Sequence, residues 1–267
     1  MRELALQVPA EAVEEVLDEL LEIAPHGVIE VARGDEVELR VRGGAPREAV
    51  LAAGRRWDAP VREREVPDDP RERRLADYEP IVVAGRLAVR PAWAPPAAPG
   101  LLEVVLADDA AFGAGTHPTT RLCLEALCSL DPAGALLDLG CGSGVLSVAA
   151  ALLGWERVVA VDRSPEAVGA TRTNAQRSGA IVDARVGDVA ALANTPADVV
   201  LANVPLPAHH AIAAALEAAP RLLIASGVQA ADADGCAQAY ARAGLEDGGS
   251  HVAGGWALIT LRRPRSD

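Results

Sequence analysis

A glycine-rich turn between two apolar stretches constrains the fold of this 267-residue chain more than any other feature. Residues 138–144 read Asp-Leu-Gly-Cys-Gly-Ser-Gly, at the end of the strand-like run Ala135–Leu139 and just before the helix-like run Val145–Leu153. A strand, a tight glycine turn and a helix in this order are typical of a parallel α/β sheet that holds a nucleotide cofactor at its carboxyl edge. The glycines let the backbone turn and approach that cofactor without a Cβ clash.

The spacing of the glycines distinguishes between two cofactors. A dinucleotide-binding turn has glycines at its first, third and sixth positions. Here Gly140, Gly142 and Gly144 occupy the first, third and fifth positions, and the acid Asp138 precedes the first glycine by two residues. An acidic turn can hold the ammonium group of S-adenosylmethionine (SAM), which has no pyrophosphate to cradle. The spacing therefore favours SAM, and an NAD-dependent dehydrogenase becomes the weaker alternative.

Apolar strand-like runs and helix-like runs alternate through the C-terminal part of the chain, which predicts a doubly wound α/β sheet. A final hairpin predicts an antiparallel last strand, as in class I SAM-dependent methyltransferases. The expected strands are Ala135–Leu139, Val158–Val161, Val182–Val186, Val199–Ala202, Leu222–Ala225, His251–Val252 and Trp256–Leu261, and the expected helices are Val145–Leu153, Pro165–Ser178, Pro207–Ala218 and Asp232–Ala243.

The N-terminal part follows a different pattern, with the order β-α-β-β-α-β of a ferredoxin-like α+β unit. We therefore expect a substrate-recognition domain over 1–75, a linker region with a hairpin over 76–100, and a SAM-binding domain over 101–267. The N-terminal elements are expected at Leu4–Val8, Glu11–Ile23, Gly27–Ala32, Glu36–Val41, Pro46–Arg56 and Val61–Val66, and the hairpin at Pro80–Ala84 and Arg86–Pro91.

Composition excludes several classes of function. The net charge is −13 and the 25 basic residues are scattered, whereas a nucleic-acid binder usually shows a basic face. No apolar run reaches the length of a membrane span, and the N-terminus does not resemble a signal peptide. The four cysteines have no zinc or redox spacing, and His117 has no partner at ligand spacing, so we expect no metal. These features predict a cytoplasmic monomer that binds neither nucleic acid nor membrane.

Polar residues follow the expected strands at the edge where such sheets bind cofactors. Asp162 can accept hydrogen bonds from both ribose hydroxyls, and Asp188 from the adenine amino group, although Asp188 can instead cap the next helix. Asn203 is the candidate catalytic residue, because a neutral amide oxygen can orient an amine lone pair towards a methyl group. His209 or His210 is a candidate proton acceptor, with a surface or capping role as the alternative for each.

A loop ahead of the sheet contains Phe112, the single phenylalanine of the chain, and we expect it to make a contact. Thr119 or Thr120 is expected to cap a helix over Arg121–Leu130.

The motifs Phe112–Thr120 and Asp138–Ala150, with the spacing to Asp162, Asn174 and Asn203, resemble the PrmA family. That family methylates ε- and α-amino groups of large-subunit ribosomal protein eleven, often to the trimethyl state. The resemblance implies a ferredoxin-like recognition domain, a linker and a class I SAM domain. It also implies that Thr120, Gly140, Asp162 and Asn203 contact SAM.

The chain departs from the family pattern at two places near these motifs. The family usually has Phe-Gly-Thr-Gly where this chain has Ala114, and Val-Pro-Leu-Pro follows Asn203 instead of an aliphatic-rich segment. A methyltransferase for another protein lysine or a small molecule therefore stays open as an alternative. A SAM-binding, ribosome-associated module without catalysis is the other alternative, motivated by the hydroxyl that Ala114 lacks.

Overall fold

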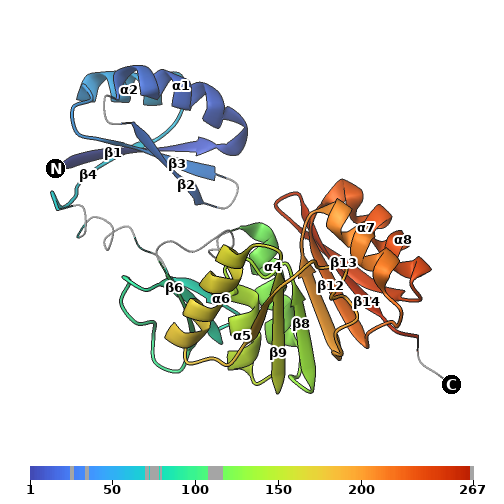
Figure 1. Ribbon diagram of the computed structural model, residues 1–267. Helices are drawn as coiled ribbons and strands as arrows, with labels where there is room; N and C mark the ends of the chain where they lie inside the picture. The colour runs from blue at the N-terminus through green and yellow to red at the C-terminus, as the bar shows by residue number, and fades with distance from the viewer. Residues whose placement is uncertain are drawn as a thin grey trace. The chain divides into compact units, whose positions relative to one another are not determined.

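The computed structural model divides into two compact units, Met1–Tyr78 and Glu79–Asp267 (Figure 1). The residues that it describes are 1–24, 27–33, 36–69, 72, 78, 80–107 and 117–264.

The N-terminal unit is a four-stranded antiparallel sheet in the order β2-β3-β1-β4, with α1 and α2 on one face (Figure 1). Alternate residues of β1, among them Leu4, Leu6 and Val8, point into the core beneath the helices. The predicted β-α-β-β-α-β order is the order observed. The elements are β1 (Arg2–Pro9), a short 3-10 turn (Ala10–Ala12), α1 (Val13–Ile23), β2 (Val28–Arg33), β3 (Glu36–Arg42), α2 (Arg47–Arg56) and β4 (Val61–Glu65).

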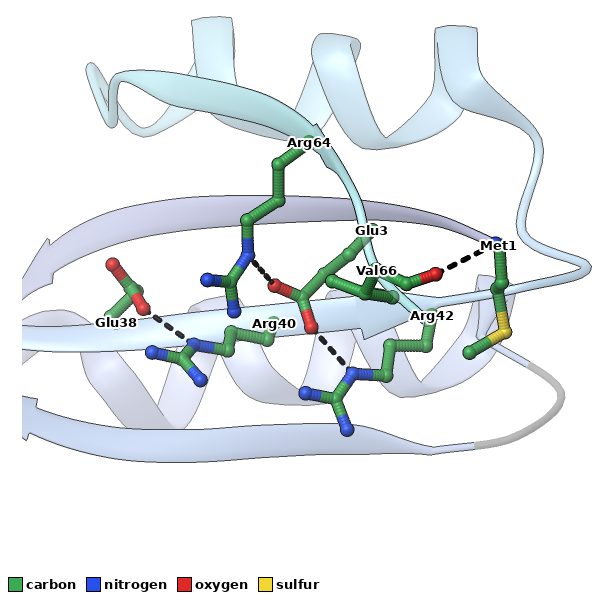
Figure 2. Close-up of polar contacts among 7 residues, drawn as sticks. All are labelled: Met1, Glu3, Glu38, Arg40, Arg42, Arg64 and Val66. Atoms are coloured by element: carbon green, nitrogen blue, oxygen red, sulfur yellow. Dashed lines mark hydrogen bonds and ion pairs between the residues drawn. The ribbon is translucent and has the colours of Figure 1, made fainter. Parts of the chain in front are cut away.

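The opposite face of this sheet carries charged residues, and Glu3 on β1 lies between two arginines (Figure 2). Arg42 on β3 and Arg64 on β4 are its cross-strand partners, and the Nε of each donates to a different Glu3 oxygen at 2.5 Å. Glu3 is fully buried, Arg42 is 17% exposed and Arg64 is 44% exposed. Both carboxylate oxygens of Glu3 are therefore paired with a cation.

The second unit contains a seven-stranded sheet in the order β10-β9-β8-β11-β12-β14-β13. The first five strands are parallel, and β14 runs antiparallel to both of its neighbours, which confirms the predicted class I methyltransferase sheet. The strands are β8 (Ala135–Leu139), β9 (Arg157–Asp162), β10 (Asp183–Val186), β11 (Val199–Asn203), β12 (Leu222–Gln229), β13 (Glu246–Ala253) and β14 (Trp256–Arg262).

Helices cover both faces of this sheet, which explains why its central strands are almost continuously apolar. Leu136 and Leu201 face one core with α4 and α5, while Leu137 and Val200 face the other with α7 and α8 (Figure 1). The helices are α4 (Pro118–Ser129), α5 (Val145–Leu153), α6 (Pro165–Arg177), α7 (Leu206–Ala215) and α8 (Ala233–Arg242), the last preceded by a 3-10 turn at Ala230–Asp232.

A three-stranded sheet in the second unit departs from the linker expected over 76–100. It contains β5 (Ile81–Val83) and β6 (Leu87–Pro91), the predicted hairpin, and β7 (Leu102–Leu106), which runs parallel to β6. Leu87 and Val89 are buried in the same core as α4 and α5. Parallel strands need a crossover connection, and the proline-rich stretch read as a linker connects β6 to β7.

In the described ranges, no helix is both long enough and apolar enough to cross a membrane.

Candidate functional site

The carboxyl ends of β8, β9 and β11 meet at one edge of the large sheet, and the glycine turn lies there. Gly140 N–H donates to the carbonyl of Val161 at 2.8 Å, which joins the turn to the end of β9. Ala202 of β11 pairs with Leu139 of β8, so Asn203 lies beside the start of the turn. The fold thus gathers Asp138, Asp162 and Asn203 from three strands.

The glycine positions of the turn do not accept other residues without strain. Gly140, Gly142 and Gly144 have φ of 81°, 53° and 77°, in the left-handed region that favours glycine. A Cβ on Gly140 would lie 2.4 Å from Val204 Cγ1, and one on Gly144 would lie 2.8 Å from the Thr171 Cα. The turn in front of α5 therefore needs glycine at these positions, with Cys141 and Ser143 between them.

Asp162 fixes the shape of this turn. Its Oδ2 accepts from the N–H of Gly142 at 3.0 Å, and its Oδ1 accepts from the N–H of Ser164 at 2.9 Å. The side chain is only partly buried, and a carboxylate oxygen can accept more than one hydrogen bond. Asp162 therefore keeps acceptor capacity for hydroxyl donors while it holds the turn.

Asp138 is fully buried, and its two oxygens differ. Oδ2 accepts a short hydrogen bond from the Ser147 hydroxyl of α5, whereas Oδ1 has no partner among the described residues. Burial is the main cause that raises the pKa of this carboxyl, the Ser147 hydrogen bonds oppose the shift, the charge of Asp162 adds to it, and the net pKa is about 6. A buried acceptor without a donor is costly, so a cationic or N–H donor at Oδ1 would be stabilising.

Asn203 presents a second acceptor of this kind. It ends β11, and its Oδ1 is buried without a hydrogen-bond donor in the described part of the chain. The following residue, Val204, donates its N–H to the Ser226 carbonyl at 3.0 Å. The backbone around Asn203 is therefore fixed while its amide oxygen is left for another partner.

Asp188 follows β10 and caps a turn, whereas the alternative to an adenine contact was the cap of a helix; no helix lies between β10 and β11 in this described part of the chain. Its Oδ1 accepts from the N–H groups of Ala190 and Ala191 at 2.9 and 3.1 Å. Gly187 N–H donates to the Asp162 carbonyl at 2.9 Å, so Asp188 lies close to the end of β9.

The start of α4 differs from the prediction. His117, and neither Thr119 nor Thr120, is the N-cap, because its Nδ1 accepts from the Thr119 N–H at 3.3 Å. Pro118 occupies the first helical position, where its missing N–H costs nothing, and this starts the helix before the threonines. Thr120 is buried in the first turn. Phe112 and Ala114 lie outside the described residues.

Neither candidate histidine is placed as a proton acceptor. His209 is fully buried, both ring nitrogens have protein partners, and burial lowers its pKa to about 4. His210 is exposed and lines a surface hollow with Gln238 and Arg242 of α8. Within the described ranges, no His, Cys, Asp or Glu side chains gather as a metal site requires.

Asn174 and Thr171 of α6 support the turn, and the sequence did not single them out as supports. Asn174 is buried, donates to the Ser143 carbonyl and accepts from the Ala107 N–H, both at 2.8 Å. The Thr171 hydroxyl donates to the Gly142 carbonyl at 3.2 Å. Their spacing of three places both on one helix face, so polar residues on an otherwise buried face were the available signal.

Comparison with known proteins gives a consistent family. The family model described as Ribosomal protein L11 methyltransferase (PrmA) matches residues 62–264. The Ribosomal protein L11 methyltransferase of Azotobacter vinelandii is 46% identical over 143 residues, 52% of this chain and 49% of that protein. The protein of the same name from Yersinia pseudotuberculosis is 42% identical over 173 residues, 62% of this chain and 58% of that protein.

A solved structure agrees with these matches. The ribosomal protein L11 methylase of Lactobacillus delbrueckii subsp. bulgaricus superimposes with a TM-score of 0.61 at 25% identity, over 70% of this chain and 99% of that one. The chain spans about half the length of the curated relatives it matches. With the glycine turn and the strand-end residues in place, the chain belongs to the Ribosomal protein L11 methyltransferase (PrmA) family.

Proposed function

We propose that this chain is a SAM-dependent N-methyltransferase that acts on amino groups, lysine side chains or an N-terminal amine, of ribosomal protein L11. The observation that carries the proposal is a pair of buried oxygens, Asp138 Oδ1 and Asn203 Oδ1, which have no hydrogen-bond partner among the described residues and lie at the edge that holds the glycine turn. The names of the relatives support the acceptor. We place the reaction in the cytoplasm, where bacterial ribosomal proteins are made.

The residues present fit SAM. When bound, SAM supplies a methyl group activated by its sulfonium sulfur. The glycines leave backbone without side chains at the sheet edge, and Asp138 Oδ1, which has no partner among the described residues, suits the ammonium of the methionine part. Asp162 retains acceptor capacity for ribose hydroxyls. Asp188 and Thr120 complete the proposed cofactor contacts, together with Phe112 from sequence alone.

Asn203 is the residue proposed to act on the methyl acceptor. Its amide oxygen can accept a hydrogen bond from the incoming amine and so fix the direction of the nitrogen lone pair. Methyl transfer needs alignment of two reacting atoms above all, and correct positioning alone supplies a large share of the rate.

The experiment that tests this function is transfer of a labelled methyl group. The purified chain is incubated with methyl-labelled SAM and L11, and in parallel with SAM and a ribosome-free cell lysate. Label on L11 amino groups, located by mass spectrometry, supports the proposal. Label on other proteins or small molecules alone would replace L11 by a different acceptor, and SAM binding without any transfer would indicate a non-catalytic module.

We further propose that the N-terminal unit recognises the protein substrate. The unit has its own core, and none of the cofactor residues proposed above lies in it. Deleting residues 1–78 should abolish transfer to L11 while SAM affinity stays near that of the full chain. A folded truncated protein that methylates L11 at the full rate would disprove this role.

A further inference from the structure

Three buried polar residues form a hydrogen-bonded network beside Asn203, the last residue of β11. His209 on α7 places Nε2 2.9 Å from the Ser226 carbonyl oxygen and Nδ1 2.9 Å from the Tyr240 hydroxyl of α8. All three residues are fully buried. Ser226 of β12 is the register partner of Asn203 on β11, so this network ends beside the proposed catalytic residue.

The chemistry of the partners fixes where the protons lie. A carbonyl oxygen only accepts, so His209 Nε2 carries the hydrogen and donates it to Ser226. A neutral imidazole then has a bare Nδ1, which accepts from the Tyr240 hydroxyl. Burial holds the pKa of His209 at about 4, in agreement with a neutral ring at neutral pH.

The Ser226 carbonyl also holds the turn after Asn203. It accepts the Val204 N–H at 3.0 Å in addition to His209 Nε2. The next residue, Gly227, has a φ of 85°, and a Cβ there would lie 2.6 Å from the Val204 carbonyl oxygen. The antiparallel pairing of β12 with β14 shifts register between Ser226 and Val228, so on that side the ladder is interrupted, while the parallel pairing with β11 continues to Ser226.

We propose that His209 and Tyr240 are positioning residues for methyl transfer. They orient the Ser226 carbonyl, which sets the backbone at Val204 and thereby the Asn203 amide oxygen. This inference rests on the proposed function, in which Asn203 aligns the amine. A displacement of about 1 Å at a reacting group can lower a rate about 100-fold, so a small shift of this carbonyl is enough to matter.

Three variants test the proposal in the full chain with SAM and L11. His209→Leu removes the donor to Ser226 and should lower kcat about tenfold or more, with the KM values for SAM and L11 within about threefold of wild type. His209→Gln keeps an N–H for Ser226 and an acceptor for Tyr240, and should recover most of the lost rate. Tyr240→Phe removes only the hydroxyl and should lower kcat about two- to fivefold.

Ile212→Val is the matched control, since Ile212 is a fully buried residue of the same helix whose apolar side chain cannot take part in these hydrogen bonds. It should lower the melting temperature and leave kcat unchanged. If His209→Leu does not fold, the kcat values of Tyr240→Phe and His209→Gln still test the proposal. A His209→Leu or Tyr240→Phe protein with wild-type kcat would overturn the proposal, and so would a His209→Gln protein as slow as His209→Leu.

A measurement without SAM separates this inference from the proposed function. Hydrogen exchange of the Val204 amide should be about tenfold faster in His209→Leu than in wild type, and close to wild type in Ile212→Val. Unchanged Val204 exchange would overturn the positioning role even if the enzyme methylates L11. Faster exchange in a chain that methylates nothing would leave the positioning intact and remove the proposed function instead.

Discussion

Each of the two units contains a fully buried carboxylate, and the two carboxylates differ in their hydrogen-bond partners. In the N-terminal unit, Glu3 is fully buried and each of its oxygens accepts from an arginine, Arg42 or Arg64. In the second unit, Asp138 is equally buried, but one of its oxygens has a single hydroxyl donor and the other has no partner among the described residues.

We propose that the difference separates a structural charge from a functional one. Buried polar groups in folded proteins are nearly always paired, and an unpaired acceptor costs about 1–3 kcal/mol. Glu3 fits the rule, because both of its oxygens have hydrogen-bond donors within the chain. Asp138, together with Asn203, breaks it at the edge where such sheets bind cofactors. We therefore assign the chemistry to the second unit, and the following variants are designed to break or sharpen this contrast.

The largest effect is expected from Asn203→Ala. Loss of the oxygen that aligns the amine should lower kcat/KM for L11 methylation about 10²- to 10³-fold, or about 2.7–4 kcal/mol. Labelled methyl transfer measures this. The control is Asn194→Ala, because Asn194 bonds to backbone at Ala215 and Glu217, away from the glycine turn, and that variant should keep its activity. Equal losses in both variants would contradict the assignment.

Glu3→Gln should destabilise the N-terminal unit by about 2–3 kcal/mol, because it leaves two arginines without their buried partner. This loss of stability lies near the lower end of the range for breaking a buried ion pair, because Arg64 is 44% exposed. Chemical denaturation measures it. Glu63→Gln, in an exposed ion pair with Arg47, should cost under about 1 kcal/mol. SAM affinity should not change in either protein, and a large loss of affinity in Glu3→Gln would break the contrast.

Asp162→Ala should weaken SAM binding about 10- to 150-fold, equivalent to about 1.5–3 kcal/mol for charge-assisted hydrogen bonds to ribose. The released N–H groups of Gly142 and Ser164 add to the loss by loosening the turn. Calorimetric titration with SAM measures it. The control is Asp183→Ala on the neighbouring strand, where the carboxylate pairs with Arg185. Wild-type affinity in Asp162→Ala would remove Asp162 from the site.

The smallest effect is expected from Asp138→Asn. It is a gain in stability, whereas the other variants lose activity, stability or affinity. Because the folded pKa of about 6 is above the ordinary value of 3.8, the fold favours the protonated acid. The stabilisation from this group is complete below pH 4 and is lost as the pH rises through 6. The shift from 3.8 to about 6 is equivalent to about 3 kcal/mol, and the buried Asn amide, which adds an N–H group that needs a partner, offsets part of it. Without SAM, Asp138→Asn should therefore be more stable than wild type at pH 7.5, by about 1–2 kcal/mol.

Denaturation at pH 7.5 measures this difference. The same carboxyl should make SAM affinity of the wild type fall as the pH drops below 6, whereas Asp138→Asn should bind weakly at every pH. An Asp138→Asn protein that is less stable than wild type at pH 7.5 would show that the ionised carboxylate is already satisfied within the fold.

Short-range patterns in the sequence predicted the fold where the chain is regular. The helix expected over Val145–Leu153 is the observed α5, because an apolar run interrupted only by Ser147 lies between two glycines that mark its ends. Strand β12 extends to Gln229, beyond the predicted Ala225, because a bulge near Gly227 interrupts the apolar pattern that marks a strand. Strand β7 was missed, since a short apolar run after prolines gives no sign of the partner strand β6.

The site likewise contains residues that the sequence predicted and contacts that it did not. Asp138, Asp162 and Asn203 were found because each ends a parallel strand, and parallel strands end at one edge. Their roles towards SAM stay predictions. The sequence did not predict that His209 bonds to Tyr240, 31 residues away, or that His117 caps α4. The first contact depends on how two helices pack on the sheet, which no local spacing encodes, whereas the cap is local and Pro118 at the first helical position was the available signal.

The most direct test of the central claim is a calorimetric titration of the cofactor-free full chain with SAM at pH 7.5. The account predicts a single saturable site that is weakened by Asp162→Ala and unaffected by Glu3→Gln, and it predicts no binding of NAD. A folded wild-type chain that binds no SAM, or that binds it equally well after Asp162→Ala, Asp138→Asn and Asn203→Ala, would contradict it.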